Sequence, residues 1–209
     1  MNSYLEEASI VGNQAIIGFD KRQVILCELA LAKRYAPFFF SWCDAQNKPD
    51  LKKSYNEQCQ TIVDNLLNPG HQQKNLAVLK KYRLELELAA DSLGEDKENA
   101  YVCQALLNLV IATNASLGSH FEAQWVICSV ASIFQATEDI VEFRESAKAL
   151  SEDEMNALKE AELNKEFQVI LKIVDMLNRK LKRGADVKKP LPKKVVDEIF
   201  AIATEDCRA

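Results

Sequence analysis

Apolar side chains recur every three or four positions over most of this chain, which is the spacing that gathers them on one face of an α-helix. Pro49 precedes one such stretch and Asn68-Pro69-Gly70 follows it, so proline and glycine mark both of its ends. A second stretch covers residues 73–93, and Gly94 stands where a helix C-cap belongs. The pattern therefore predicts a helix over each stretch.

The first part of the chain carries the same spacing, which predicts a helix over residues 19–35. An aromatic run from Phe38 to Phe40 follows, together with Trp42. Pro37 stands just before this run, and a proline fits the first turn of a helix because the N–H that it lacks has no partner there. We therefore expect a second, short helix that begins near Pro37.

Two later stretches are apolar on almost every side. Residues 100–117 contain no charged side chain, and none occurs between residues 123 and 137. Helices that are apolar all round lie in the centre of a protein, so the sequence predicts a central hairpin of helices over residues 100–117 and 121–150, with its turn at Gly118-Ser119-His120. The side chains expected to be almost fully buried there are Leu106, Leu109, Val110, Val126, Val130, Ile133 and Phe134.

The helix that follows has a clear beginning. Ser151-Glu152-Asp153-Glu154 forms a capping box, in which the serine caps the third helical N–H and Glu154 reaches back. Apolar residues from Leu163 to Leu181 then alternate in steps of four and three, the rhythm of a coiled-coil seam. The seam is too short for a free-standing coiled coil, so we expect it to pack inside the bundle.

A basic linker separates this helix from the end of the chain. Residues 179–194 contain eight Lys or Arg and one acidic residue, Asp186. The short amphipathic segment at residues 195–203 needs a surface to pack on, because an isolated helix of this length is marginal in water. We expect it to be docked with Phe200 buried, on its own body or on a partner.

These elements predict an all-α fold, a single-domain helical bundle of about seven or eight helices around the central apolar hairpin. Residues 1–183 form the helical body, and residues 184–209 form the basic linker and the terminal amphipathic helix. The 209 residues are 48% hydrophobic and 27% charged, which is ordinary for a globular protein.

Charge and cysteine usage narrow the function classes. A net charge of −5 argues against nucleic acid as a partner, because phosphates must be neutralised. The uncharged run at residues 99–121 contains too many polar side chains to insert well, so we expect no membrane association. Six cysteines occur without CxxC spacing or a secretion signal. These features favour reduced, mostly buried thiols and a cytoplasmic location.

Reactive side chains are sparse. The two histidines, His71 and His120, do not follow a Glu or Asp at metal-binding spacing, and the six glycines form no phosphate-binding loop. We therefore expect no metal, no cofactor and no catalytic residue.

Uncharged polar residues inside the apolar hairpin form the candidate ligand site. Gln104 and Asn108 share a helix face at i and i+4, and Gln124 and Ser132 lie on the second helix. Such side chains can hydrogen bond between helices, because buried amides must be satisfied. Alternatively, they can line a small-ligand pocket between helices.

Several segments resemble one family. Leu26-Cys27-Glu28, Tyr35 with the aromatic run after it, the apolar helix from Tyr101, and the capping box at Ser151 are similar to the YjaG-like proteins. The resemblance covers roughly residues 18–180. The chain departs from the pattern in extra residues between Glu28 and Tyr35 and in its basic tail. The resemblance implies an all-α fold in the bacterial cytoplasm, and it carries no activity with it.

Two functions remain open from the sequence. The first is a non-enzymatic interaction or regulatory protein with a protein partner or as a homo-oligomer, which the lack of a catalytic constellation favours. The second is a small-ligand binder or helical enzyme that uses the polar residues of the hairpin.

Overall fold

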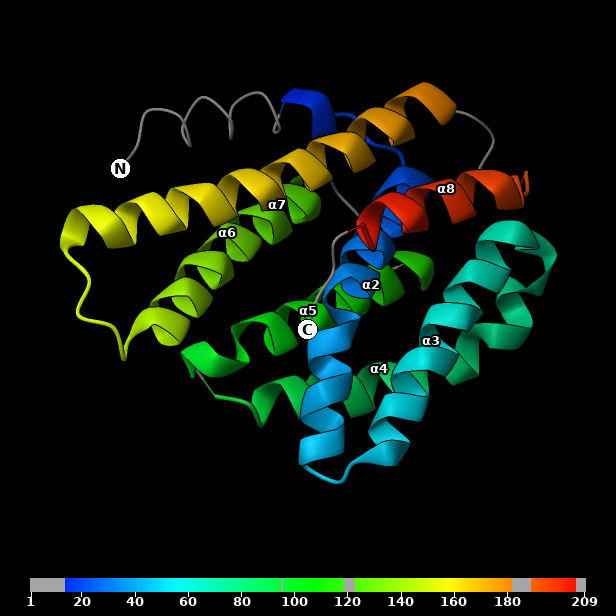
Figure 1. Cartoon of the computed structure of the whole chain (residues 1–209). Coiled ribbons are helices and arrows are strands. Elements are labelled where there is room, and N and C mark those ends of the chain that lie inside the picture. Colours follow the sequence, from blue (N-terminus) through cyan, green and yellow to red (C-terminus); the bar gives the residue numbers. More distant parts are fainter. Residues whose placement is uncertain (1–13, 95, 119–122, 182–188, 206–209) are drawn as a thin grey trace.

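The computed structural model describes residues 14–94, 96–118, 123–181 and 189–205 (Figure 1). About 85% of the structure is helical, and no strand occurs within those ranges, so the predicted all-α fold is confirmed. Short 3-10 turns at Pro69–His71 and Lys97–Asn99 precede two of the helices. The α-helices are α2 (Lys21–Ala45), α3 (Pro49–Leu67), α4 (Gln72–Asp91), α5 (Ala100–Ser116), α6 (Ala123–Glu145), α7 (Glu152–Lys180) and α8 (Lys193–Ala203).

Helix α2 lies in the centre of the bundle. The Asp20 side chain caps its first turn and Gln23 returns the bond, which makes a capping box. The helix then runs unbroken through Pro37, so the expected second helix near Pro37 is wrong. Tyr35 and Phe39, on either side of the proline, are almost fully buried. Burial of both flanks offsets the hydrogen bond that a proline removes from a helix interior.

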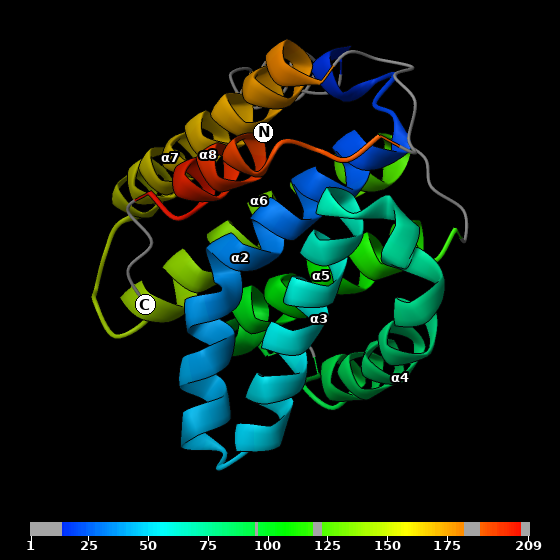
Figure 2. The ribbon, with the colours of Figure 1, turned by 90° about the vertical axis from the view of Figure 1, so that its right-hand side faces the viewer.

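The other helices surround α2 (Figures 1 and 2). Helix α5 packs along it, and α2 also contacts α3, α6, α7 and α8. On one side α6 packs against α5 and α7 packs against α6, whereas α3 and α4 form a hairpin on the other side. The capping box at Ser151 begins α7 as predicted, and its seam residues Leu163, Ile170 and Leu177 are buried within the bundle.

The predicted centre requires a correction. Helix α5 is central, but its main partner is α2, and α6 keeps one face exposed. Helix α2 was not predicted as the centre because it contains the charged residues Arg22, Glu28 and Arg34, which are nevertheless buried. Helix α6 ends at Glu145, earlier than expected. Of the expected core, Leu106, Leu109, Val126, Val130 and Ile133 are buried, whereas Val110 and Phe134 are half-buried.

The terminal helix α8 packs on α7 and α2. Val195, Val196 and Ile199 form its buried face. Phe200 is half-buried rather than buried, because it lies at the edge of this face under the Lys33 ammonium, 4.9 Å from its ring centroid.

Two predicted features lie partly or wholly outside the described residues. These are the tip of the turn at Ser119-His120 and the part of the basic linker at residues 182–188. Gly118, which enters the turn, has a positive φ of 80°. In the described ranges, no helix combines the length and the hydropathy that crossing a membrane requires.

Candidate functional site

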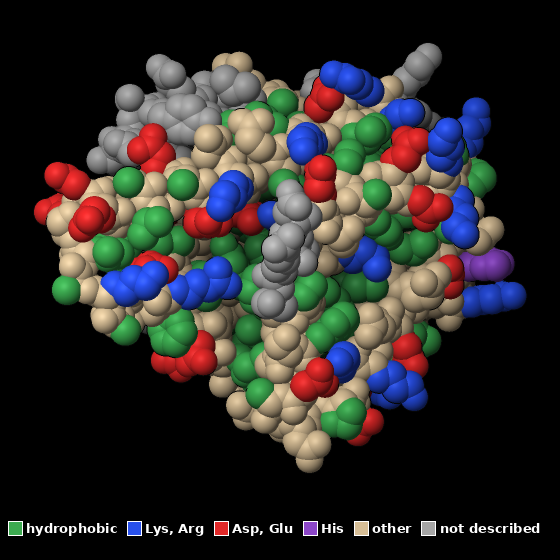
Figure 3. All heavy atoms as spheres, viewed as in Figure 1, with side chains coloured by type: hydrophobic (Ala, Val, Ile, Leu, Met, Phe, Trp, Pro, Cys, Tyr) green, Lys and Arg blue, Asp and Glu red, His purple; other side chains and the backbone are tan. Residues whose placement is uncertain are grey.

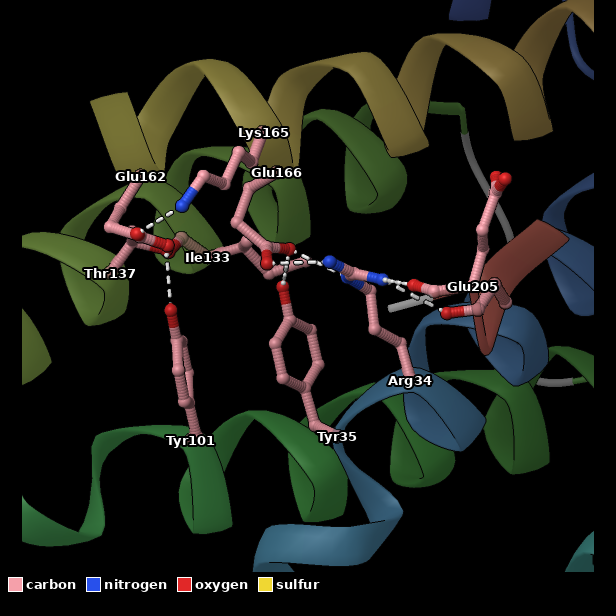
Figure 4. A network of polar contacts seen from close by, with 10 residues as sticks. Arg34, Tyr35, Tyr101, Ile133, Thr137, Glu162, Lys165, Glu166 and Glu205 are labelled. Carbon is pink, nitrogen blue, oxygen red and sulfur yellow. Dashed lines mark hydrogen bonds and ion pairs between the residues drawn. The ribbon is translucent and has the colours of Figure 1, made fainter. Parts of the chain in front are cut away.

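A buried ion pair joins α2 to α7 (Figure 4). Arg34 donates from Nε and Nη2 to the two carboxylate oxygens of Glu166, each at 2.7 Å. Tyr35 donates its hydroxyl to Glu166 Oε2, also at 2.7 Å. The fork of two parallel bonds is the strongest geometry that a guanidinium and a carboxylate can form, so Glu166 is held from two consecutive residues of α2.

The same arginine holds the end of α8. Its Nη1 donates to the carbonyl oxygens of Ala203 at 3.0 Å and Glu205 at 3.3 Å. Carbonyls in the last turn of a helix have no partner within the helix, and a cation there is favoured by the helix dipole. Arg34 therefore connects α2, α7 and α8 through one guanidinium, beside an open polar cleft of about 600 Å³ on α7.

Two tyrosines continue this network toward α6. Tyr35 stacks on Tyr101 with ring centroids 5.0 Å apart, and the Tyr101 hydroxyl donates to Thr137 Oγ1 at 3.2 Å. Burial raises the pKa of Tyr35 well above its usual value and the pKa of Tyr101 to about 12. Both phenols stay protonated near neutral pH, so they serve as hydrogen-bond donors and not as bases.

A second buried carboxyl, Glu28, forms no ion pair with a described residue. Glu28 is fully buried on α2, and Asn108 of α5 donates to its Oε2 at 2.8 Å. Burial raises the Glu28 pKa to about 8, and the neighbouring Asn108 and Ser129 side chains offset part of that rise. No described residue donates to Asn108 Oδ1. The carboxyl is therefore mostly protonated at neutral pH, as an acid inside an apolar core is expected to be.

The structure separates the four predicted ligand-binding residues. Gln104 donates to Ser132 Oγ at 2.5 Å, which joins α5 to α6, and Asn108 is engaged with Glu28. Gln124 is exposed in the first turn of α6 and belongs to neither pair. Interhelical hydrogen bonding thus accounts for two of these contacts, while a ligand-binding role for the four residues stays a prediction.

The thiols follow the burial of their helices. Cys27, Cys43 and Cys59 are buried, Cys103 is half-buried, and all described cysteines are free. Burial raises the pKa of Cys43 to about 11 and that of Cys59 to about 12. Such thiols remain protonated and poorly nucleophilic. Cys128 departs from the expected burial, because it lies on the exposed side of α6.

That exposed side is an uncharged strip over the first half of α6. We call it the α6 face, and define it by Gln124, Trp125, Cys128, Ala131 and Gln135, all of which are exposed. Trp125 leaves 48% of its surface in solvent. By contrast, acidic and basic side chains are intermixed over α7, α8 and α3 (Figure 3). The α6 face therefore differs in chemistry from the surface over α7, α8 and α3.

Leu107 is an exposed apolar side chain on α5. It is 39% exposed, and its helix packs against α6. The hydrogen bond between Gln104 and Ser132, one turn before Leu107, fixes the register of the two helices.

Sequence reasoning missed the buried charges Glu28, Arg34 and Glu166. A signal existed in the sequence. Glu28 interrupts an otherwise apolar run, and Arg34 and Tyr35 are consecutive residues of the same predicted helix. Within the described ranges, no group of three or more His, Cys, Asp or Glu lies together as a metal site would require.

Comparisons of the chain with protein-family models, with curated proteins and with solved structures found no match.

Proposed function

We propose that this chain is a non-enzymatic helical interaction protein of the bacterial cytoplasm, and that it binds an uncharged apolar helix of a protein partner through the α6 face. The observation that carries the proposal is the exposed Trp125 in a strip of α6 without charged side chains. Tryptophan is among the residues most enriched at the energetic centres of interfaces.

Charge indicates the chemistry of the partner. A charged helix would lose hydration on the α6 face and find no ion pair there, whereas an uncharged apolar helix loses little. Such a helix would contact the α6 face with apolar residues at i, i+3, i+4 and i+7, which lie on one side of a helix. The net charge of −5 also disfavours a nucleic-acid partner.

The chemistry of the interior supports a binding role over a catalytic one. The raised pKa values of Tyr35 and Cys59 keep these groups in their protonated, unreactive forms. Free thiols at the described cysteines fit a reducing compartment. Membership of the YjaG-like family, proposed on the resemblance above, agrees with this location.

The proposal is tested with a photoreactive amino acid at position 131 of the full chain, in its native cell. We expect a crosslink to one partner, mapped by mass spectrometry to an apolar helix. In the purified pair, Trp125→Ala should weaken binding by tenfold or more, the loss of about 1.4 kcal/mol or more. Because the contact is uncharged, affinity should change little with salt.

Phe143→Ala is the matched control, because Phe143 is an aromatic residue of the same helix with a similar exposure of 45%. It should leave affinity unchanged. Equal losses from both variants, a crosslink to a charged segment, or a crosslink only to a second copy of this chain would each contradict the proposal.

A further inference from the structure

A second site lies where the first turn of α2 meets the turn between α3 and α4 (Figure 2). A cavity of about 550 Å³ opens there, a size typical of small-molecule sites. Lys21 and Arg22 line it from α2, and Asn65 and Gln72 line it from the other side. None of its described lining residues is acidic, although the whole chain has a net charge of −5.

Arg22 is buried but incompletely bonded. It is 7% exposed, its Nη1 reaches the Lys189 carbonyl at 3.4 Å, and its Nη2 lies 3.8 Å from Asp20 Oδ2. No described residue accepts from its Nε. Charge-assisted bonds are normally 2.7–2.9 Å long, and a buried guanidinium with unused donors is costly.

Arg34 shows what a satisfied guanidinium looks like in this protein. It is equally buried, at 6% exposure, and donates to Glu166 at 2.7 Å through two nitrogens and to two carbonyls besides. The contrast indicates that, among the described residues, Arg22 lacks an acceptor as close as those of Arg34. An oxyanion in the adjoining cavity would supply it.

The rest of the lining suits an anion as well. Burial lowers the pKa of Lys21, and an anion beside its ammonium would offset that desolvation. Asn75 donates to Asn65 Oδ1 at 2.7 Å, so this bond occupies the acceptor of the Asn65 amide and not its NH₂ donor. The first turn of α4 contains no acidic residue, so no side-chain charge there opposes an anion.

We propose that this cavity binds a small organic phosphate, with the phosphoryl group between Lys21 and Arg22. A guanidinium and an ammonium together match the charge of a phosphate monoester, and the fork of Arg22 matches its oxygens. Ile25 and Leu66, which also line the cavity, would contact the organic part. A lone carboxylate offers less charge and fewer acceptors. The site is separate from the α6 face, and the proposal does not depend on the interaction function.

The test is a titration of the full chain with inorganic phosphate, glycerol 3-phosphate and propionate at constant ionic strength, with chloride as the reference salt. Amide chemical shifts and the thermal midpoint are the readouts. We expect saturable shifts at residues 21–25 and 65–73, and a midpoint that rises with ligand by mass action. Glycerol 3-phosphate should bind most tightly, phosphate less so, and propionate least.

Variants locate the site. Lys21→Gln should weaken glycerol 3-phosphate binding by roughly tenfold, the loss expected for one charge-assisted contact, and Arg22→Gln should abolish it. Lys53→Gln is the matched control, because it removes the same charge from an exposed lysine of α3 outside the cavity. Arg22→Gln could also impair folding, so Lys21→Gln decides the matter. The proposal is overturned if phosphate acts no differently from chloride, or if Lys21→Gln and Lys53→Gln have equal effects.

Discussion

Two buried carboxyls, those of Glu28 and Glu166, both lose hydration in the interior, and each is stabilised in a different way. Glu166 faces Arg34 and accepts three short hydrogen bonds, two from the guanidinium and one from Tyr35. Among the described residues, Glu28 accepts a hydrogen bond only from the Asn108 amide, and burial raises its pKa to about 8. Burial thus permits a charged carboxylate where a cation is supplied, and otherwise favours the protonated acid.

Helix α2 takes part in both environments, because it contains Glu28 and also Arg34, the partner of Glu166. Glu28 and Arg34 both belong to α2, less than two turns apart, and both are buried. Arg34 points to α7 and α8, whereas Glu28 points to α5 and α6. The two carboxyls therefore differ in the groups that neighbouring helices place against them.

The largest effect is expected from Arg34→Met. It leaves Glu166 buried without its cation and frees the last carbonyls of α8, so the free energy of unfolding should fall by about 3–5 kcal/mol. Urea unfolding at pH 7 measures the loss. In the double variant with Glu166→Met, part of the loss should be recovered, because no unpaired charge remains. A double variant as unstable as the sum of the single ones would contradict this interpretation.

Glu28→Gln should raise the free energy of unfolding, whereas Arg34→Met lowers it. The Glu28 pKa of about 8 exceeds the ordinary 4.5, so the folded protein binds a proton that the unfolded chain releases. The stabilising contribution of that proton is complete below pH 4.5 and is lost as the pH rises to about 8. Glutamine needs no proton and can donate to Asn108 Oδ1, so we expect a gain on the order of 3 kcal/mol at pH 7.

The pH dependence of unfolding provides the control for that variant. The difference between Glu28→Gln and the unsubstituted protein should vanish near pH 4.5 and grow toward pH 8. A difference that stays constant over this range would show that Glu28 does not change protonation on unfolding.

A smaller loss is expected from Tyr35→Phe. The change removes one hydrogen bond to Glu166, while both guanidinium bonds and the stacking on Tyr101 remain. A hydrogen bond to a charged group contributes roughly 1.5–3 kcal/mol, and the value here should lie at the lower end. Thermal unfolding measures it. If Arg34→Met is already present, adding Tyr35→Phe should cost a different amount, because the two donors share one carboxylate.

The smallest effect is expected at the exposed ion pair between Lys172 and Glu205. Its atoms lie 2.9 Å apart, yet both side chains are more than half exposed. Lys172→Ala should change stability by less than about 1 kcal/mol, and the change should disappear in high salt. A loss comparable to that of Arg34→Met would mean that solvent exposure does not separate these two links between α7 and the end of α8.

Much of the fold could be predicted from local pattern. The punctuation by Pro49 and Gly70, the capping box at Ser151 and the seam from Leu163 each act within a few turns of one helix, so they can be identified in the sequence. The prediction that Pro37 stands near the start of a helix was wrong, because burial of Tyr35 against α5 and of Phe39 against α3 is a tertiary effect.

The candidate sites were less predictable. Gln104 and Ser132 were chosen as polar residues of the hairpin, and the structure brings them together, but it places Gln124 on the surface. The cavity beside Arg22 joins residues more than forty positions apart, and nothing in the spacing of Lys21, Arg22 and Asn65 indicates that they meet.

The sequence by itself determined that this chain is helical and where most of its helices begin and end, because capping and hydrophobic periodicity are local. The buried charged residues are also visible in the sequence, although their burial is not. Only the tertiary structure decided that α2 lies at the centre, that Arg34 pairs with Glu166 across the bundle, and that Glu28 meets no cation in the described part of the chain. The physical reason is that the energy of a buried charge depends on the groups placed within a few ångströms of it, and that placement is set by packing between helices distant in sequence.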